Sequence, residues 1–462
     1  METRAAHPRS RGLLRHREFL KLWAGQSISE LGSEITLLAL PLVAVLTLHA
    51  GAFQVGVLGA VGLAPFILVG LPAGVWVDRL GRRRPILVLA DVGRIVSIGS
   101  IPVAAAFFHL TLVHLYIAAF VTGVLTVFFD VAYQSYLPAL VDYDQLVDGN
   151  AKLELTRSGA ALVGPPLGGS LVGVFGAPVA MTADAISYVV SVVSLLSIRH
   201  VEPRAERPLV RVSMRSDIAA GLRYVLGHPL LRPIAMCTST WNFFGNMYFA
   251  MIVLFCVRIL GMSATEIGVA VGVGSIGAPI GAFIAAPVSR RIGVGPTIVL
   301  SAALGSGGLL VALAPRSNPV PFVIGASFIG AVGVIYNITQ VSLRQAICLP
   351  AFQGRMNATM RFLVWGTIPI GSFLGGVLGS SIGLRPTMVI GAAGTLLAVV
   401  PVALSPVRTL HTIEEAIPAE VGEHRGTDPL RGASELPLPG SIAPAEPLPA
   451  GEAGAAEARD NS

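Results

Sequence analysis

Charged residues are scarce in this sequence: they make up 13% of the 462 residues, about half the share found in soluble globular proteins. Hydrophobic residues supply 53%, and the mean hydropathy is +0.73. This composition excludes an intrinsically disordered chain, which needs high charge density and low hydrophobicity. It also argues against a water-soluble protein and predicts a membrane protein.

Lysine and cysteine are rare as well. Lysine occurs only at Lys21 and Lys152, so arginine supplies nearly all of the positive charge. The arginines lie between apolar runs and do not form the continuous basic stripe that nucleic-acid binding needs, so no nucleic-acid partner is expected. The cysteines are too scattered for a disulfide framework or a zinc site, and we interpret them as small buried apolar residues. They are Cys237, Cys256 and Cys348.

Motifs for enzymatic chemistry are missing too. There is no glycine-rich phosphate loop ending in Lys-Ser or Lys-Thr, which argues against ATP as the energy source. Nucleophile elbows and His/Cys ligand spacings are also absent. We therefore expect no enzyme, no catalytic residues, no metal site and no cofactor.

Long apolar runs fill most of the chain. A helix that crosses about 30 Å of hydrocarbon needs about 20 apolar residues. Twelve runs fit this length, and none shows the alternation of a membrane β-barrel strand. The first is too long for a signal peptide and lacks a cleavage site. The predicted spans are residues 20–48, 53–77, 85–108, 111–137, 152–175, 178–198, 230–258, 264–288, 296–315, 319–343, 356–382 and 384–404.

The loops differ in charge on the two sides of the predicted membrane. Arginines gather before span 1 and after spans 2, 6 and 8, whereas the opposite loops are nearly uncharged. The positive-inside rule then places both termini in the cytoplasm, in a multi-pass protein of the plasma membrane.

The fold class predicted is an all-α membrane protein with twelve transmembrane helices in two six-helix, pseudo-symmetric halves. The linker between the halves is amphipathic at helical spacing, and the end of the chain is rich in Pro, Gly, Ala and Glu. The expected segments are a cytoplasmic N-terminal segment at 1–19, the first half at 20–198, a cytoplasmic linker with an amphipathic helix at 199–229, the second half at 230–404, and a disordered cytoplasmic tail at 405–462.

An internal repeat supports the two halves. A shift of 207 residues places Asp130 on Asn337 and residues 167–169 on residues 374–376, without a gap. Near the start, Gly32 matches Gly245 at a shift of 213. Parallel repeats of this kind are typical of secondary transporters, whose binding site lies between the halves.

Two motifs resemble those of the major facilitator superfamily. The loop after span 2 resembles its G-x-x-x-D-R-x-G-R-R signature, through Gly74, Asp78, Arg79, Gly81, Arg82 and Arg83. In span 5, Gly164, Pro165, Gly168 and Gly169 resemble the G-P-x-x-G-G motif of its exporters. The stretches 130–169 and 337–376 are similar to the branch of macrolide-efflux and enterobactin-exporter-like permeases.

This resemblance implies roles for the two motifs. The loop after span 2 would be a cytoplasmic gating hinge, in which Asp130 of span 4 pairs with Arg82; the alternatives are a merely topology-setting loop and substrate contact by Asp130. The span 5 motif either seals the exit path or serves only tight helix packing. Drug–proton antiporters of the superfamily often carry an arginine in span 4 before a Q-G pair, but here Gly123 follows Thr122. Proton coupling by such an arginine is therefore excluded.

Acids inside the apolar spans are the sharpest signal for function. Glu30 and Glu34 lie one helical turn apart on one face of span 1. A charge at this depth is costly, so it usually lines a cavity or has a partner. A carboxylate that holds either a proton or a cationic substrate suits an antiporter; the alternative is a permanently protonated group at a helix interface. Asp91 and Arg94 are expected to form a local ion pair, and Asp184 is interpreted as structural.

The polar and aromatic residues of spans 7 and 10 are the expected cavity lining, because the superfamily lines its cavity with spans 1, 4, 7 and 10. Trp241 could instead be an interfacial anchor. The candidates are Trp241, Asn242, Asn246, Tyr336, Asn337 and Gln340.

The function expected is a secondary active transporter that exports small amphipathic molecules of the drug or macrolide type, by alternating access and proton antiport. Its partners would be the substrate, protons and the lipid bilayer, and the protein would be a monomer. The alternatives are a narrow-specificity siderophore or metabolite exporter, an importer, and a non-transporting receptor or scaffold.

Overall fold

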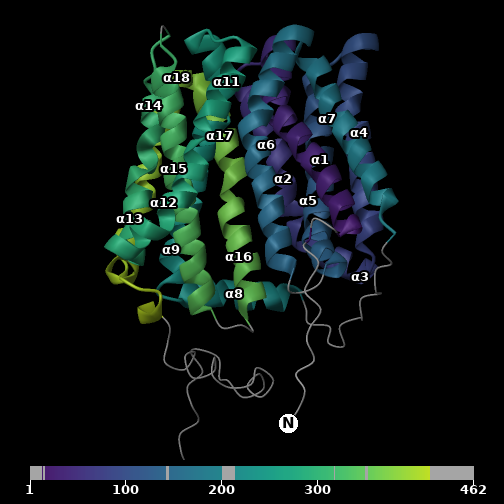
Figure 1. Cartoon of the computed structure of the whole chain (residues 1–462). Coiled ribbons are helices and arrows are strands. Elements are labelled where there is room, and N and C mark those ends of the chain that lie inside the picture. Colours follow the sequence, from purple (N-terminus) through teal and green to yellow (C-terminus); the bar gives the residue numbers. More distant parts are fainter. Residues whose placement is uncertain are drawn as a thin grey trace, which may run out of the picture. The chain divides into compact units, whose positions relative to one another are not determined.

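The computed structural model describes residues 13, 16–141, 145–199, 214–316, 318–348 and 352–416, and these form helices and turns without any strand (Figure 1). The α-helices are α1 (Arg17–Leu42), α2 (Ala52–Leu68), α3 (Gly70–Leu80), α4 (Arg83–Phe107), α5 (Leu112–Leu140), α6 (Leu146–Phe175), α7 (Ala177–Ser197), α8 (Met214–Gly227), α9 (Leu231–Phe249), α10 (Ile252–Phe255), α11 (Ala264–Gly274), α12 (Gly277–Ile292), α13 (Val294–Leu304), α14 (Gly308–Ala312), α15 (Val320–Ile347), α16 (Gln353–Trp365), α17 (Thr367–Ser381), α18 (Leu384–Gly394) and α19 (Val399–Ala403).

The all-α membrane fold predicted from the sequence is confirmed. Eleven helical stretches of the described chain are long and apolar enough to cross a membrane. The remaining span, predicted at 53–77, is divided into α2 and α3, which meet at Val69. Pro72 has no N–H group to donate to the carbonyl oxygen of Leu68, four residues earlier, and Gly70 brings no side chain to the junction, so the helix breaks here.

The repeat is visible in irregular backbone as well as in sequence. After α1 the chain forms a π-helix at Val43–Thr47, and after α10 it forms a second π-helix at Cys256–Leu260. The two segments are related by a shift of 213 residues, the shift that relates Gly32 to Gly245. Spans 1 and 7 thus share a local departure from α-helical geometry.

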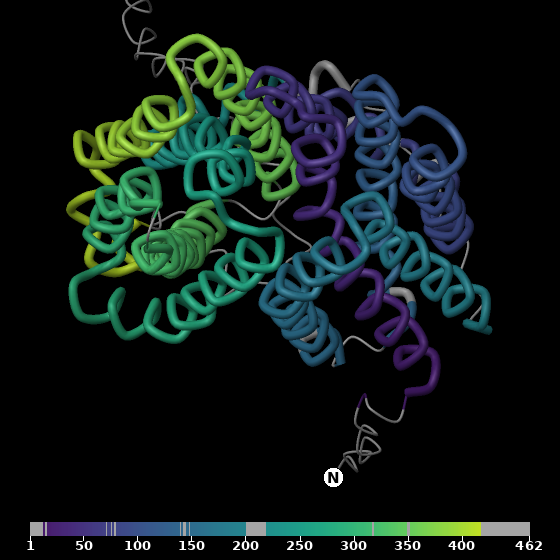
Figure 2. The backbone as a smooth tube through the Cα atoms, turned by 90° about the horizontal axis from the view of Figure 1, so that it is seen from above, coloured from purple at the N-terminus to yellow at the C-terminus, as the bar shows by residue number. Residues whose placement is uncertain are grey.

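The helices gather into two groups (Figure 2). In the first half, α1 packs on α6 and α7, and α4 packs on α5 and α7. In the second half, α9 packs on α17 and α18, and α12 packs on α15. The main contacts between the halves join α2 to α17 and α6 to α11.

We call the end of the bundle where α1 begins and α19 finishes the terminus end, and the opposite end the far end. One hydrophobic core lies at the far end and contains residues of both halves, such as Leu42 and Leu254. The terminus end has two separate cores, one around Phe19 in the first half and one around Val402 in the second. The halves therefore share a core only at the far end.

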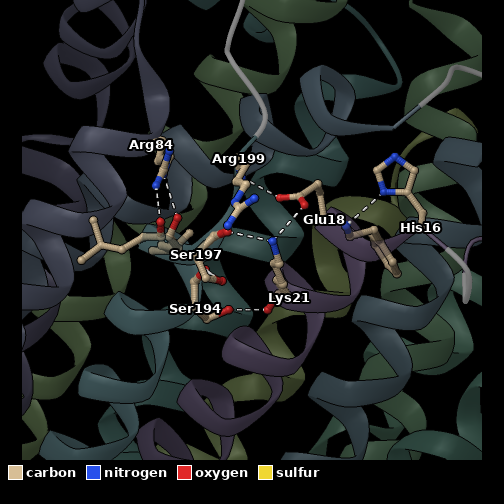
Figure 3. A network of polar contacts seen from close by, with 10 residues as sticks. His16, Glu18, Lys21, Arg84, Ser194, Ser197 and Arg199 are labelled. Carbon is tan, nitrogen blue, oxygen red and sulfur yellow. Dashed lines mark hydrogen bonds and ion pairs between the residues drawn. The ribbon is translucent and has the colours of Figure 1, made fainter.

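A polar network fastens three helices at the terminus end of the first half (Figure 3). Lys21 Nζ lies 2.9 Å from Glu18 Oε1 and donates to the Ser197 carbonyl oxygen at 2.7 Å. Arg84 Nε and Nη2 donate to the carbonyl oxygens of Leu195 and Leu196, at 2.7 and 2.6 Å. These cations satisfy carbonyl groups that the last turn of α7 leaves free.

The folded part of the chain extends beyond the boundary expected at 404. Residues 406–416 form short 3₁₀ turns, and Val407 is fully buried. Gly295 N donates to the Leu410 carbonyl oxygen at 2.8 Å, so this segment satisfies a donor in the first turn of α13. The His411 N–H donates to Glu415 and lowers the pKa of that carboxyl. The remainder of the expected tail, 417–462, lies outside the described residues.

The linker helix is present as α8 and lies at the terminus end, against α16 and α9 (Figure 1). It matches the short amphipathic helix expected in the second half of the linker 199–229. Residues 200–213, which precede it, are outside the described part of the chain.

We predict that Gly295→Ala destabilises the protein, because a Cβ atom at this position would overlap the carbonyl oxygen of Val407. The expected loss is about 1–3 kcal/mol, seen as a lower midpoint of thermal unfolding in detergent. Gly333→Ala in α15 is the matched control, since nothing lies within 4 Å of a Cβ atom there. Equal midpoints for the two variants would contradict the docking of residues 406–416.

Candidate functional site

The two acids of span 1 lie half-buried on α1. Gln26 Nε2 donates to Glu30 Oε1 at 3.2 Å. Glu34 lies where α1 crosses α6, and a Cβ atom at Gly164 would collide with the Glu34 Cβ atom. The structure therefore places the Cβ atom of Glu34 against Gly164 of the span 5 motif.

Asp130 of α5 is half-buried and has charged neighbours from four other helices. Glu30 of α1 repels it, whereas Arg94 of α4, Arg157 of α6 and Arg361 of α16 attract it. Arg361 belongs to the second half, and its guanidinium lies 4.7 Å from the centre of the Trp365 ring. Sequence reasoning missed Arg361, although an arginine inside an apolar span was available as a signal.

The ion pair expected between Asp130 and Arg82 is not formed among the described residues. Arg82 is exposed at the N-cap of α4. Asp130 lies ten residues before the end of α5, which is about 15 Å inside the bundle. Arg94 is buried about three helical turns into α4. It is this arginine of α4 that attracts Asp130 electrostatically.

The predicted gating loop after span 2 contains a tight turn at Gly81. Gly81 adopts a φ of 62° between α3 and α4, which is the left-handed region that glycine enters without strain. Gly74 lies in α3 with open space around it. Arg83 begins α4. The side chains of Asp78 and Arg79 are outside the described part of the chain.

The predicted residues of spans 7 and 10 form a joined polar and aromatic set. Trp241 stacks on Tyr336 with ring centres 5.6 Å apart, and the Tyr336 hydroxyl lies 2.7 Å from Thr238 Oγ1. Gln340 Nε2 donates to Asn337 Oδ1 at 3.1 Å. Trp241 is therefore held between helices and is not a free interfacial anchor.

A cavity of about 190 Å³ opens beside Trp241, between α9, α15, α18 and the turns that follow α13 and α18. Asn242 Nδ2 donates to the Val364 carbonyl oxygen and Asn246 Nδ2 to the Asn242 carbonyl oxygen, so both amide groups are held in place. The lining combines one indole ring and these two amides with apolar surface. The residues used here are Trp241, Asn242, Asn246, Gly305, Ile329 and Thr395.

The structure adds Gly305 to the residues that line this cavity. Gly305 leaves room for Trp241, because a Cβ atom there would lie 2.5 Å from Cζ3 of the indole ring. The glycine-rich run at 305–308 was the available signal for it. Asn337 and Gln340 do not line this cavity, and Tyr336 reaches it only through Trp241.

The span 5 motif lies at the crossing of three helices. Gly164 and Gly168 face α1, where a Cβ atom at Gly168 would lie 3.2 Å from the Ile35 Cα atom. Gly169 faces α11 of the other half, and a Cβ atom there would lie 2.9 Å from the Gly268 Cα atom. The carbonyl group of Pro165 also faces Gly268. The motif thus allows α6 to pack closely on α1 of its own half and on α11 of the other half.

Its repeat mate in α17 makes the same contacts. Gly371 and Gly375, at a shift of 207, pack on Phe243 and Met247 of α9, as Gly164 and Gly168 pack on α1. Gly376 faces Gly56 of α2 in the other half, with 2.8 Å between a Cβ atom at Gly376 and the Gly56 Cα atom. Both contacts between the halves therefore include a pair of glycines set backbone against backbone, and the α2–α17 contact also includes the rings of Phe53 and Phe373, whose centres are 6.0 Å apart.

The sequence matches a known family across most of its length. Residues 10–424 match the family described as transmembrane secretion effector. The multidrug efflux pump Tap of Mycolicibacterium fortuitum is 28% identical over 396 residues, which cover 82% of this chain and 93% of that pump. The pump of the same name from Mycobacterium tuberculosis is 26% identical over 77% of this chain and 85% of its own length.

Solved structures share the fold at low sequence identity. A bacterial homologue of the lysosomal transporter Spinster, inward-facing and occupied, has a TM-score of 0.68 at 14% identity, covering 86% of this chain and 97% of its own. A bacterial homologue of the iron transporter ferroportin, inward-facing, has a TM-score of 0.64 at 17% identity, covering 85% and 99%.

We predict that Gly164→Ala destabilises the crossing of α1 and α6 by about 1–3 kcal/mol, because the added methyl group collides with Glu34. Gly159→Ala on the same helix is the control, since a Cβ atom there meets nothing within 4 Å. Thermal unfolding in detergent measures both. A midpoint for Gly164→Ala at or above that of Gly159→Ala would show that the crossing tolerates side chains.

Proposed function

Because this chain belongs to the transmembrane secretion effector family of major facilitator transporters, we propose that it exports small amphipathic molecules, by alternating access and with proton antiport as the energy source. The full-length similarity to pumps named for multidrug efflux supports broad specificity. The location proposed is the plasma membrane, and the unit proposed is a monomer.

The division of the hydrophobic core carries this proposal. An alternating-access transporter consists of two bodies that separate first at one end and then at the other. Here the halves share a core at the far end and have separate cores at the terminus end. Each half is held together by its own contacts, such as the Lys21 and Arg84 network of the first half.

The orientation follows from the charges at the terminus end. Arg290 and Arg291 end α12 there, and Arg84 and Lys21 lie near the ends of α4 and α1. The positive-inside rule puts this end in the cytoplasm, so the state in which the far end is closed accepts substrate from the cell interior.

The substrate class follows from the interior surface. The cavity beside Trp241 offers an aromatic face and apolar surface, with the amides of Asn242 and Asn246 to orient a polar group. Across the bundle, Glu30 and Glu34 offer negative charge. Aromatic rings and carboxylates both attract organic cations, so amphipathic cations fit this interior best. A carboxylate that exchanges its proton for such a cation provides the coupling.

Reconstituted vesicles test this function, with ethidium and the macrolide erythromycin as probes. Under an imposed proton gradient we expect wild-type protein to accumulate ethidium, and Glu34→Gln to lose about tenfold or more of that accumulation, because the amide cannot exchange a proton. Glu414→Gln, an exposed acid beyond α19, is the control and should transport like the wild type.

The outcomes separate the parts of the proposal. If Glu34→Gln still accumulates ethidium, Glu34 is not required for proton coupling. A folded wild type that moves neither probe would overturn drug export and favour a narrow-specificity siderophore or metabolite exporter.

We also predict that the double variant Gly59→Cys, Ser372→Cys stops transport when oxidised. A Cβ atom at Gly59 would lie 3.5 Å from the Ser372 Cβ atom, which suits a disulfide between α2 and α17. The bond would hold the far end closed, and a reductant should restore transport. The single variants are controls for the buried native cysteines. Full transport with the disulfide formed would refute alternating access through the far end.

A further inference from the structure

A charged arginine lies inside the first half, away from the cavity described above. Arg94 is 4% exposed, in the middle of α4. Its Nη1 atom lies 3.5 Å from Oδ1 of Asp91, which is fully buried. The local ion pair expected from the i, i+3 spacing is present, but it involves only one side of the guanidinium.

The rest of the guanidinium lies between two aromatic rings. Its central carbon lies 4.1 Å from the centre of the Phe129 ring and 5.1 Å from that of the Tyr188 ring. Nε and Nη2 have no hydrogen-bond partner in the part of the chain that the structure describes. Aromatic faces attract a cation without fixing it to one acceptor, so the guanidinium can turn toward a new partner.

A second buried acid is nearby on α7. Asp184 is fully buried against Gly32 of α1, where a Cβ atom would lie 2.6 Å from Asp184 Oδ1. Ser187 Oγ donates to this Oδ1 at 3.1 Å, whereas Oδ2 has no hydrogen-bond partner among the described residues. Arg94 attracts Asp184 electrostatically.

Asp130 is the third acid that acts on Arg94. It attracts Arg94 without an ion pair within 4 Å in the described chain. It also faces Glu30, which links it to the acids of span 1. Charged and titratable groups that face this set come from every helix around it: Asp91 and Arg94 of α4, Asp130 of α5, Tyr188 and Asp184 of α7, Glu30 of α1, Arg157 of α6 and Arg361 of α16.

Asp91, Asp184 and Asp130 share the attraction of Arg94, while Arg361 and Arg157 act more weakly on Asp130. An unpaired charge in a low-dielectric interior is far more costly than an exposed one, so the surplus carboxyl groups are stable there only when they hold protons. Asp91 is held as the closest partner of Arg94 and accepts a hydrogen bond from Ser191 Oγ at 2.6 Å. Asp130, half-buried and facing the other half, is the acid of the three with access to the interior.

We propose that Arg94 couples the proton to the transport cycle by exchanging partners. When Asp130 takes up a proton, its charge is lost and Arg94 stays in its ion pair with Asp91, as in this structure. When Asp130 gives up the proton to water on the other side of the membrane, its carboxylate attracts the guanidinium and the helices α4, α5 and α7 shift relative to one another. This rests on the proposed function, because it names the residues through which that antiport works.

The test compares two transport measurements on the same vesicles. Exchange of ethidium at equal concentrations inside and outside needs no net proton movement, whereas accumulation under a proton gradient does. We expect Arg94→Gln and Asp130→Asn to keep exchange within about twofold and to lose about tenfold or more of the accumulation. Arg94→Lys keeps the charge and should recover part of it, and Glu414→Gln is the control.

A structural role would give a different pattern. If Arg94→Gln lowered exchange and accumulation together, or left accumulation intact in a folded protein, the proposal would be overturned. Asp184→Asn is a second variant in case Arg94→Gln does not fold. It removes one negative charge that attracts Arg94, so that Arg94 should bind Asp130 more firmly and again uncouple accumulation from exchange.

Infrared difference spectroscopy in detergent tests the protonation of Asp130 directly, without any substrate. We expect a band from a protonated carboxyl group at neutral pH that Asp130→Asn removes and that persists to higher pH in Arg94→Gln, because the neighbouring cation is gone. Absence of that band would overturn the proposal even if ethidium export is real. Its presence in a protein that moves no ethidium would refute drug export and leave the proton site standing.

Discussion

A polar group inside a bilayer has no water with which to form hydrogen bonds, so it needs a partner within the protein, and this constraint shapes the whole molecule. It makes every described span a helix, because helices satisfy their own backbone groups. At the end of α7, where carbonyl groups are left over, Lys21 and Arg84 supply the missing donors. The same constraint makes Arg94 informative: a cation kept in the interior with unpartnered nitrogen atoms has a cost that ordinary packing does not explain.

The contacts between helices within the first half differ in kind from the contacts between the two halves. Within the first half, charged side chains and large buried rings connect the helices. Between the halves, Gly169 meets Gly268 and Gly376 meets Gly56, so the backbones approach closely at both crossings. Large apolar side chains of both halves join at the far end, in the shared core that contains Leu42 and Leu254. Among the described residues the hydrophobic core that joins the halves therefore lies at one end, as expected for one state of an alternating-access transporter.

Much of the fold could be read from the sequence, because apolar length and arginine placement are strong one-dimensional signals. The spans, the repeat and the linker helix follow from them. The break at Val69 was missed because proline and glycine, here Pro72 and Gly70, are common enough in membrane helices to leave a span intact. The docking of residues 406–416 was missed because their composition resembles that of a tail, and only the free donors of α13 explain it.

The candidate site was predicted less well, for a geometric reason. Spacing along one helix showed that Glu30 and Glu34 share a face, and that Asp91 and Arg94 pair. Which helices face each other was not encoded in spacing, so Asp130 was assigned to an exposed arginine when a buried one of the neighbouring helix acts on it. The absence of an arginine from span 4 therefore does not deprive α5 of a cation. The adjacent helix supplies it, and the acid and the cation can then move apart with the helices that carry them.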